Sequence, residues 1–242
     1  MRRGDGGSPF AAPAVRVLAV DDAAAAVGLL ARGFADEPGN VALFPNQAAR
    51  IRLFKGSGKA QLRRRLRRGT VHGVFLDGEL VAVAVWDAPA SGTGGVGEIA
   101  QGLGERLVLL WDLRSDIAHA ASVARDHLAD ALRLARWRQM TIAEASRGSA
   151  WHLAFLATDP AHRGKGLARA LLDRQLTRCD EDGLAVWLET TDPVNPPLYE
   201  RFGFRTVGHL HRPAWWPGYW VMRREPRDGA QTAAEGEHHR QV

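Results

Sequence analysis

The stretch from 151 to 204 contains the residues best suited to chemistry. A strongly apolar segment, 149–158, is followed by a proline turn and then by the sequence Arg163-Gly164-Lys165-Gly166-Leu167-Ala168. Glycines let backbone N–H groups approach a ligand, and the first turn of a helix has unpaired N–H donors at its positive end. Arg163 and Lys165 add charge at the same place. The pattern predicts a pyrophosphate cradle at a helix start, although a glycine turn between packed elements is the simpler alternative.

Two motifs in this stretch resemble those of one enzyme family. RGKGLA fits the pattern R/Q-x-x-G-x-G/A on Arg163, Gly166 and Ala168, and NPPLYERFGF (195–204) has an Asn followed by Tyr-Glu-x-x-Gly-Phe. Both are similar to the markers of the GNAT N-acetyltransferases, of which the first is a coenzyme A-binding signature. Through FADEP, LVAVAVWDAPAS and LET, the chain most resembles puromycin N-acetyltransferase and related actinobacterial drug acetyltransferases.

The resemblance implies acetyl-CoA as the donor. The pantetheine arm would pair with the strand that ends at Thr158, and a backbone N–H near Leu156 or Ala157 would polarise the thioester oxygen. Asn195 would contact the cofactor or the neighbouring helix, unless it only caps that helix. The residues expected to bind the cofactor are Leu156, Ala157, Thr158, Arg163, Gly164, Lys165, Gly166, Leu167, Ala168 and Asn195.

Acetyl transfer to an amine also needs a proton donor for the leaving thiolate, and we assign that role to Tyr199. A phenol with a pKa of about 10 is protonated at neutral pH, and a thiolate with a pKa of about 8.5 is a base of comparable strength. The resemblance also puts Tyr199 at the family's general-acid position. The alternative is a helical residue that packs its ring and exposes its hydroxyl group.

The proton acceptor is marked less clearly. Many family members have a glutamate on the strand before the signature, whereas this strand reads WHLAFLATD. Glu189 is the preferred candidate, because in LAVWLET it shares a strand face with Trp187, and an apolar neighbour favours a protonated carboxyl group. A salt-bridged strand end is the simpler interpretation of Glu189. His152 is a second candidate, and an amine that loses its proton easily would need no strong base.

The acceptor is expected to be a small amine with aromatic or hydrophobic character, such as an aminonucleoside-type antibiotic. The chain has eight tryptophans and two tyrosines, and several tryptophans lie between the last two predicted strands. We expect Trp215 to wall an acceptor pocket with Trp86 and Phe34, with a dimer contact or a hydrophobic corner as alternatives. Asp36 and Glu37 could steer a cationic amine.

Hydrophobic periodicity predicts the elements that position these residues. We expect strands at 15–20, 70–76, 79–86, 149–158, 184–190, 204–211 and 218–224, with helices at 22–35, 47–67, 98–113, 120–140, 164–180 and 197–202. Asp77-Gly78 predicts a hairpin turn, and Pro38 and Gly39 are expected to break the chain. The order predicts an α/β (α+β) fold with a mixed, mostly antiparallel sheet of about six to seven strands, helices on both faces and a helical insert near 98–148. We expect one domain at 15–224 between flexible tails at 1–14 and 225–242.

Composition excludes several classes of function. The 242 residues are 45% hydrophobic and 24% charged, which is typical of a globular protein. No apolar run approaches the ~20 residues of a membrane helix. The beginning is a poor secretory signal and Cys179 is the one cysteine, so we expect a cytoplasmic protein, with no metal site. The basic run from Lys55 to Arg68 is interpreted as the solvated face of a helix, and we expect no nucleic-acid partner.

Two rival interpretations remain beside an N-acetyltransferase that works by direct attack in a ternary complex. A non-catalytic acyl-CoA sensor on the same fold is favoured by the missing glutamate in WHLAFLATD. The segment 92–97 matches the dinucleotide pattern G-x-G-x-x-G, but it follows no strand directly, so a flexible loop is favoured. The sequence leaves open the acceptor, the base, the biological role and whether the chain is a monomer or a homodimer.

Overall fold

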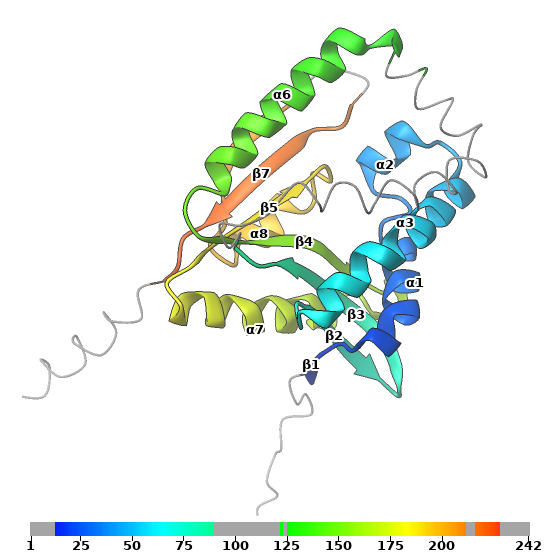
Figure 1. Cartoon of the computed structure of the whole chain (residues 1–242), viewed down its shortest axis with the longest axis vertical. Coiled ribbons are helices and arrows are strands. Elements are labelled where there is room, and N and C mark those ends of the chain that lie inside the picture. The colour runs from blue at the N-terminus through cyan, green and yellow to red at the C-terminus, as the bar shows by residue number, and fades with distance from the viewer. Residues whose placement is uncertain (1–12, 90–121, 123–124, 212–215, 228–242) are drawn as a thin grey trace, which may run out of the picture.

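A computed structural model of the chain describes residues 13–89, 122, 125–211 and 216–227 (Figure 1). Its strands are β1 (Val15–Val17), β2 (Val71–Leu76), β3 (Glu79–Asp87), β4 (Ala150–Thr158), β5 (Ala185–Thr190), β6 (Arg205–Leu210) and β7 (Tyr219–Arg224). Its helices are α1 (Ala23–Gly33), α2 (Pro38–Leu43), α3 (Gln47–Arg67), α6 (Leu128–Ala145), α7 (Leu167–Glu181) and α8 (Pro196–Glu200), with single 3-10 turns at Val20–Asp22 and Pro160–His162. The predicted elements at 98–113 and the glycine-rich segment at 92–97 lie outside the described residues.

The strands form one sheet of seven in the order β1-β2-β3-β4-β5-β7-β6. Every neighbouring pair is antiparallel except β4 and β5, which are parallel. This confirms the predicted mixed, mostly antiparallel sheet. The tight turn between β2 and β3 is the predicted one, because both Asp77 and Gly78 have positive φ values, 50° and 84°.

Strands β4 and β5 stay together over a short distance only. Their register begins at Ala150–Ala185 and ends at Leu153–Leu188. Beyond that point β4 continues beside β3 to Thr158, whereas β5 continues beside β7. A register shift opposite Val85 and Trp86 makes β4 bulge at the same place, and a bulge bends the strand that contains it. The sheet therefore divides into two halves at its centre.

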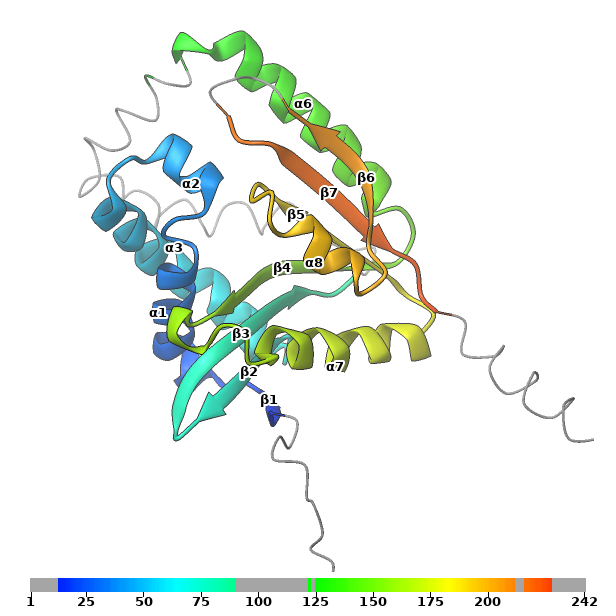
Figure 2. The same ribbon diagram turned by 180° about the vertical axis from the view of Figure 1, so that it is seen from behind.

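Helices cover both faces of the sheet, as predicted. Helices α1 and α3 pack on one face over the β1–β4 half, and α6 packs on the same face over β5–β7 (Figure 1). Helices α7 and α8 cover the opposite face, which Figure 2 shows from behind. Successive residues of β5 point to opposite faces: Val186 and Leu188 pack under α7 and α8, whereas Trp187 packs on the α6 side.

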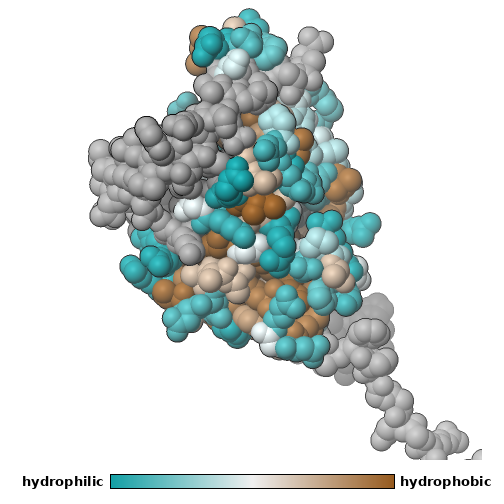
Figure 3. All heavy atoms as spheres, turned by 90° about the vertical axis from the view of Figure 1, so that its right-hand side faces the viewer, coloured by the Kyte–Doolittle hydropathy of each residue, from teal (hydrophilic) through white to brown (hydrophobic). Residues whose placement is uncertain are grey.

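The surface seen in Figure 3 mixes hydrophilic residues with smaller apolar areas. Large exposed hydrophobic side chains are scattered over several elements, including Leu132 and Met140 on α6 and Val207 on β6. Among the described residues, no helix combines the length and the apolar character needed to span a membrane.

One local prediction is wrong. The sequence DEPGN was expected only to end the first helix, but Pro38 opens the short helix α2. Proline is tolerated there because the first helical residue needs no hydrogen bond from its nitrogen. The Glu37 side chain caps the new helix by accepting a 2.9 Å hydrogen bond from the Asn40 N–H, and the Gly39 N–H donates to Thr191 Oγ1 at 3.0 Å. The start of α2 is thereby tied to the end of β5.

The core under α7 includes a buried histidine on β2, His72. Burial lowers the pKa of His72 from 6.5 to about 4, and the nearby charges of Arg174 and Arg178 on α7 act in the same direction. The folded protein therefore keeps this imidazole neutral over a pH range in which the unfolded chain protonates it.

We predict that His72 makes the protein less stable in mild acid. Its folded-state pKa lies below the unfolded value, so the free energy of unfolding falls as the pH drops from 6.5 to about 4, by at most about 3 kcal/mol. His72→Phe removes this contribution and retains a ring of similar size. Urea unfolding at a series of pH values measures it, and an equally steep decline in the variant would contradict the assignment.

Candidate active site

The turn between β4 and α7 is fixed by Asp159. Its N–H donates to the carbonyl of Val81 on β3 at 2.8 Å, and its carboxylate accepts from the Ala161 N–H at 3.0 Å and from Arg32 of α1 at 3.2 Å. The hydrogen bond from Ala161 is the main cause that lowers the pKa of Asp159. The turn is thus anchored to both β3 and α1, so the start of α7 has a defined place beside the end of β4.

The start of α7 has the features predicted for a phosphate site. Gly164 and Gly166 have φ values of 78° and 75°, and a Cβ at either position would meet no atom within 4 Å. The first intrahelical bond runs from the Ala170 N–H to the Gly166 carbonyl, so the N–H groups of the three residues between them have no helical partner. The side chains of Arg163 and Lys165 are exposed beside them. Exposed amides, open space and positive charge fit a diphosphate.

Leu167 and Ala168, which end the motif Arg163–Ala168, also attach helix α7 to the core. Leu167 is only 3% exposed and packs in the same cluster as Leu171 and Leu172. Ala168 is half-buried beside it. The glycines therefore remain at the surface while the residues that follow them hold α7 on the sheet.

The free edge of β4 lies next to this helix start. Asp159 and Val81 are directly opposite and hydrogen-bonded, so the backbone groups of Ala157 and Phe155 also point toward β3. Those of Leu156 and Thr158 point the other way, to the side where β5 has diverged, and no described strand pairs with them there. The register thus favours Leu156 over Ala157 as the N–H that meets a thioester oxygen.

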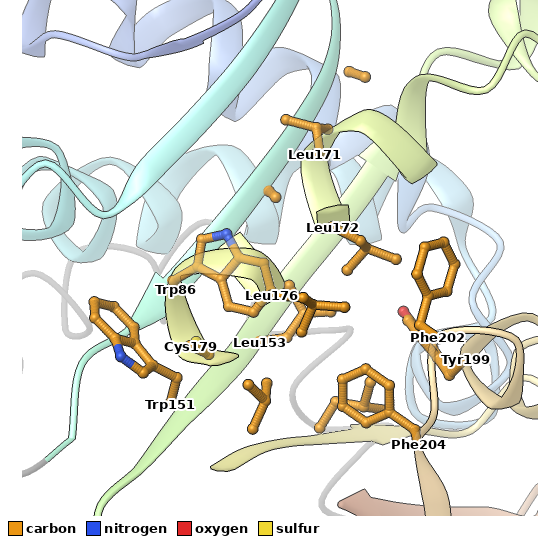
Figure 4. Packing of buried hydrophobic residues seen from close by; sticks show 14 of the residues in the cluster. Trp86, Trp151, Leu153, Leu171, Leu172, Leu176, Cys179, Tyr199, Phe202 and Phe204 are labelled. Carbon is orange, nitrogen blue, oxygen red and sulfur yellow. The ribbon is translucent and has the colours of Figure 1, made fainter. Parts of the chain in front are cut away.

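Tyr199 lies in the apolar cluster on the α7 side of the sheet. Its residue is 8% exposed, and its ring meets Phe204 edge to face at 5.8 Å (Figure 4). Burial raises the pKa of the Tyr199 hydroxyl group, so this group keeps its proton at neutral pH. The tyrosine is positioned by Asn195, whose carbonyl accepts from the Tyr199 N–H and whose Nδ2 donates to Thr190 Oγ1 of β5 at 2.9 Å. The side chain of Asn195 does not cap α8.

Glu189 lies on the opposite face of β5 and is tied to α6. One carboxylate oxygen is ion-paired with Arg138 of α6, and the other accepts a 2.5 Å hydrogen bond from the Tyr219 hydroxyl group. Trp187 shares its strand face, as predicted, but stacks on His152 instead of covering the carboxylate. Each oxygen of Glu189 already has a protein partner, and its role as a base stays a prediction.

On the same face of the sheet as Glu189 lies a polar cluster that contains His152, the second candidate base. The sequence did not indicate its contacts with Asp87 and Arg65. Arg65 of α3 forms a two-point ion pair with Asp87 of β3, at 2.7 and 2.8 Å, and His152 Nδ1 lies 3.4 Å from Asp87 Oδ2. Burial alone would raise the pKa of Asp87, but the hydrogen bonds from His152 and Arg65 hold it well below its usual range. Arg65 therefore does not belong to the solvated face predicted for the basic run.

The predicted acceptor residues are not brought together. Phe34 is half-buried on the α1 side, where it contacts Phe54 at 5.7 Å and Phe155 at 5.5 Å. Trp86 is fully buried under α7, on the other face of the sheet, so it does not line a surface pocket with Phe34. Trp86 shares this face with Ala82 and Ala84 of β3, and α7 covers it. Trp215 lies outside the described residues.

Two other titratable side chains, Glu37 and Cys179, also have shifted pKa values. Glu37 is mostly buried, and burial together with the nearby charge of Asp192 raises its pKa despite hydrogen bonds from the backbone. Cys179 is fully buried, and burial raises its pKa to about 11, so it has the character of a core residue.

The fold and the site define an enzyme-like protein that can hold a diphosphate at a helix start and an extended arm along an open strand. Comparison with known proteins agrees with this class. Residues 44–204 match the model of the acetyltransferase (GNAT) family. The chain therefore belongs to the acetyltransferase (GNAT) family, whose enzymes use acetyl-CoA as the acetyl donor.

Individual relatives support the family and the fold. An uncharacterized N-acetyltransferase of Schizosaccharomyces pombe, C550.08, is 37% identical over 54 residues, which are 22% of each chain. A Corynebacterium glutamicum structure, described as histone acetyltransferase HPA2 and related acetyltransferase, is similar with a TM-score of 0.57 and 21% identity over 90% of this chain and 98% of that one. Arylalkylamine N-acetyltransferase 2 of Aedes aegypti is similar with a TM-score of 0.55 and 15% identity, over 88% and 99%.

We predict that Gly166→Val weakens coenzyme A binding at least about tenfold, because the side chain enters the space of the diphosphate and φ becomes unfavourable. Gly183→Val is the matched control, since Gly183 ends α7 with a φ of 65° and equally open surroundings. Both variants should lose similar stability. Calorimetric titration with coenzyme A measures the difference, and equal affinities in the two variants would contradict the site.

Proposed function

We propose that the chain transfers the acetyl group of acetyl-CoA to a primary amine of a small molecule, by direct attack within a ternary complex. The observation that supports this most strongly is the divergence of β4 from β5 beside the start of α7. It leaves the Leu156 and Thr158 backbone without a strand partner, and an extended arm bound there would have the start of α7, the proposed anion site, at its far end. The donor supplies an acetyl group activated as a thioester.

Each step can be assigned to groups of this chain. The amides of Leu167 and Ala168, with Arg163 and Lys165, bind the diphosphate. The Leu156 N–H donates a hydrogen bond to the carbonyl oxygen as negative charge develops on it during attack. The nitrogen of the neutral amine forms a bond to the carbonyl carbon and gives up one N–H proton to a base, the carbon–sulfur bond breaks, and the Tyr199 hydroxyl group gives its proton to the departing sulfur.

The acceptor is proposed to bind on the face covered by α1 and α6. Phe34, Phe54 and Phe155 supply aromatic surface there, and Glu37 with Asp192 forms an acidic border that attracts a cationic amine. An aromatic, antibiotic-like amine of the puromycin type fits both features. The arylalkylamine enzyme of Aedes aegypti, which has a similar fold, takes small aromatic amines by its name. We also propose that residues 15–224 act as one domain and that the protein works in the cytoplasm.

The acceptor class is tested by thiol release from acetyl-CoA with a panel of amines. Puromycin, 2-phenylethylamine, spermidine and a lysine-containing peptide are suitable probes. We predict that the aromatic small amines give the highest kcat/KM, because the aromatic surface and the acidic border act together on them. Turnover with the peptide alone would contradict the proposal, and turnover with none of them would favour a non-catalytic sensor.

Tyr199→Phe tests the assignment of the acid. We predict that kcat falls by about 100-fold or more, because a positioned proton donor contributes at least that much. Coenzyme A affinity should stay unchanged, since the phenyl ring preserves the packing against Phe204. Steady-state kinetics and calorimetry measure the two effects separately. A variant with undiminished kcat would remove Tyr199 from the mechanism.

A further inference from the structure

Three neighbouring strands place a line of interacting side chains across the centre of the sheet. Asp87 of β3 is opposite His152 of β4, and His152 is opposite Trp187 of β5. The imidazole stacks on the indole with ring centroids 3.8 Å apart and an angle of 10° between the planes. Its Nδ1 faces Asp87, which Arg65 holds from α3. The imidazole is therefore fixed in position and in orientation by its neighbours.

The other ring nitrogen has no partner. His152 Nε2 is inaccessible to water, and no hydrogen bond to it is present among the described residues. Because a carboxylate accepts only from an N–H, Asp87 favours the tautomer with its proton on Nδ1. Nε2 then presents a lone pair that nothing in the described part of the chain uses. A buried polar atom without a partner is costly, and a ligand that donates an N–H to Nε2 would complete it.

The position of His152 is the second observation. Its pair with Trp187 is the last but one before β4 and β5 diverge. The side chain lies on the face of α3 and α6, whereas Tyr199 lies in the cluster on the face of α7 and α8. An amine that approaches the point of divergence from the acceptor face meets the imidazole first, and a thiolate that leaves toward the other face meets the phenol.

Among the described residues, the charged groups around the imidazole come from five elements. Asp87 of β3 and Arg65 of α3 are directly connected to it. Two residues further along β5, Glu189 is occupied by Arg138 of α6. On β7, Arg223 is opposite Trp187, and its guanidinium donates to the Ala145 carbonyl and pairs with Glu225.

We propose that His152, oriented by Asp87, is the general base that accepts the proton of the attacking amine. This inference rests on the proposed acetyltransferase activity. The amine enters in its neutral form, its nitrogen bonds to the carbonyl carbon, and one of its N–H protons passes to Nε2. The carbon–sulfur bond breaks, and the sulfur takes the proton of Tyr199. The imidazolium then loses its proton and the Tyr199 phenolate regains one, so that amide and free thiol are the net products.

Nitrogen NMR of the imidazole tests the tautomer without any acceptor. With ¹⁵N-histidine-labelled protein and His152→Gln to assign the signal, we expect His152 to carry its proton on Nδ1 when neutral. Asp87→Asn should shift the population toward the Nε2–H tautomer. A wild-type imidazole protonated on Nε2 would overturn the proposal, because that nitrogen would have no lone pair to accept a proton.

The pH dependence of kcat tests the role in turnover, with the best amine of the panel. We expect an acidic limb in the wild type, because His152 must be neutral, and a loss of that limb with a fall in kcat of about 100-fold in His152→Gln. His209→Gln is the matched control, since His209 also stacks on an indole, that of Trp220, at 4.4 Å. Glu189→Gln should retain the limb.

The possible outcomes distinguish a failure of the proposed base, His152, from a failure of the proposed acetyltransferase activity. If His152→Gln does not fold, the smaller loss expected in Asp87→Asn, with KM unchanged, provides the same test. A normal kcat and an intact limb in both variants would overturn the inference and leave the acetyltransferase proposal in place. Loss of the limb in Glu189→Gln instead would assign the base to Glu189. No turnover with any amine would overturn the function and the inference together.

Discussion

The short pairing between β4 and β5 is the constraint on which the rest of the structure depends. It ends at Leu153–Leu188, and the backbone beyond it on β4 has no partner on the β5 side among the described residues. Unpaired strand groups inside a sheet are costly unless something completes them. An extended arm would do so, and the start of α7, which we propose as the anion site, lies where such an arm would end.

The proposed acid, Tyr199, and the proposed base, His152, lie on opposite faces of the sheet near this divergence. Tyr199 of α8 lies in the apolar cluster on the α7 side, whereas three polar side chains, Asp87, His152 and Glu189, lie on the face of α3 and α6. Burial keeps the proton on the Tyr199 phenol at neutral pH, while charged partners fix the histidine. The positions of α3 and α6 matter for the site because Arg65 and Arg138 reach it from those helices.

Local patterns in the sequence were sufficient for most of the fold. The hairpin at Asp77-Gly78, the helix after Gly166 and the alternation of LAVWLET each depend on neighbours within a few residues, and the structure has all three. Prediction from local patterns failed where contacts between residues far apart in the sequence determine the structure. Pro38 opens a helix because Glu37 caps it and Thr191 anchors it, and Trp86 is buried because α7 packs over its face of β3. The link between Asp87 and His152 spans 65 positions and depends on strand register, which no local signal records.

Amide hydrogen exchange tests the central claim most directly, since it reads the backbone groups that the open strand and the helix start offer. On addition of coenzyme A, we expect slower exchange at Leu156 and Thr158 and at the first amides of α7, with little change at the far edge of the sheet in β6. Unchanged exchange at these amides in the presence of bound coenzyme A would show that the ligand lies elsewhere, and would contradict the account.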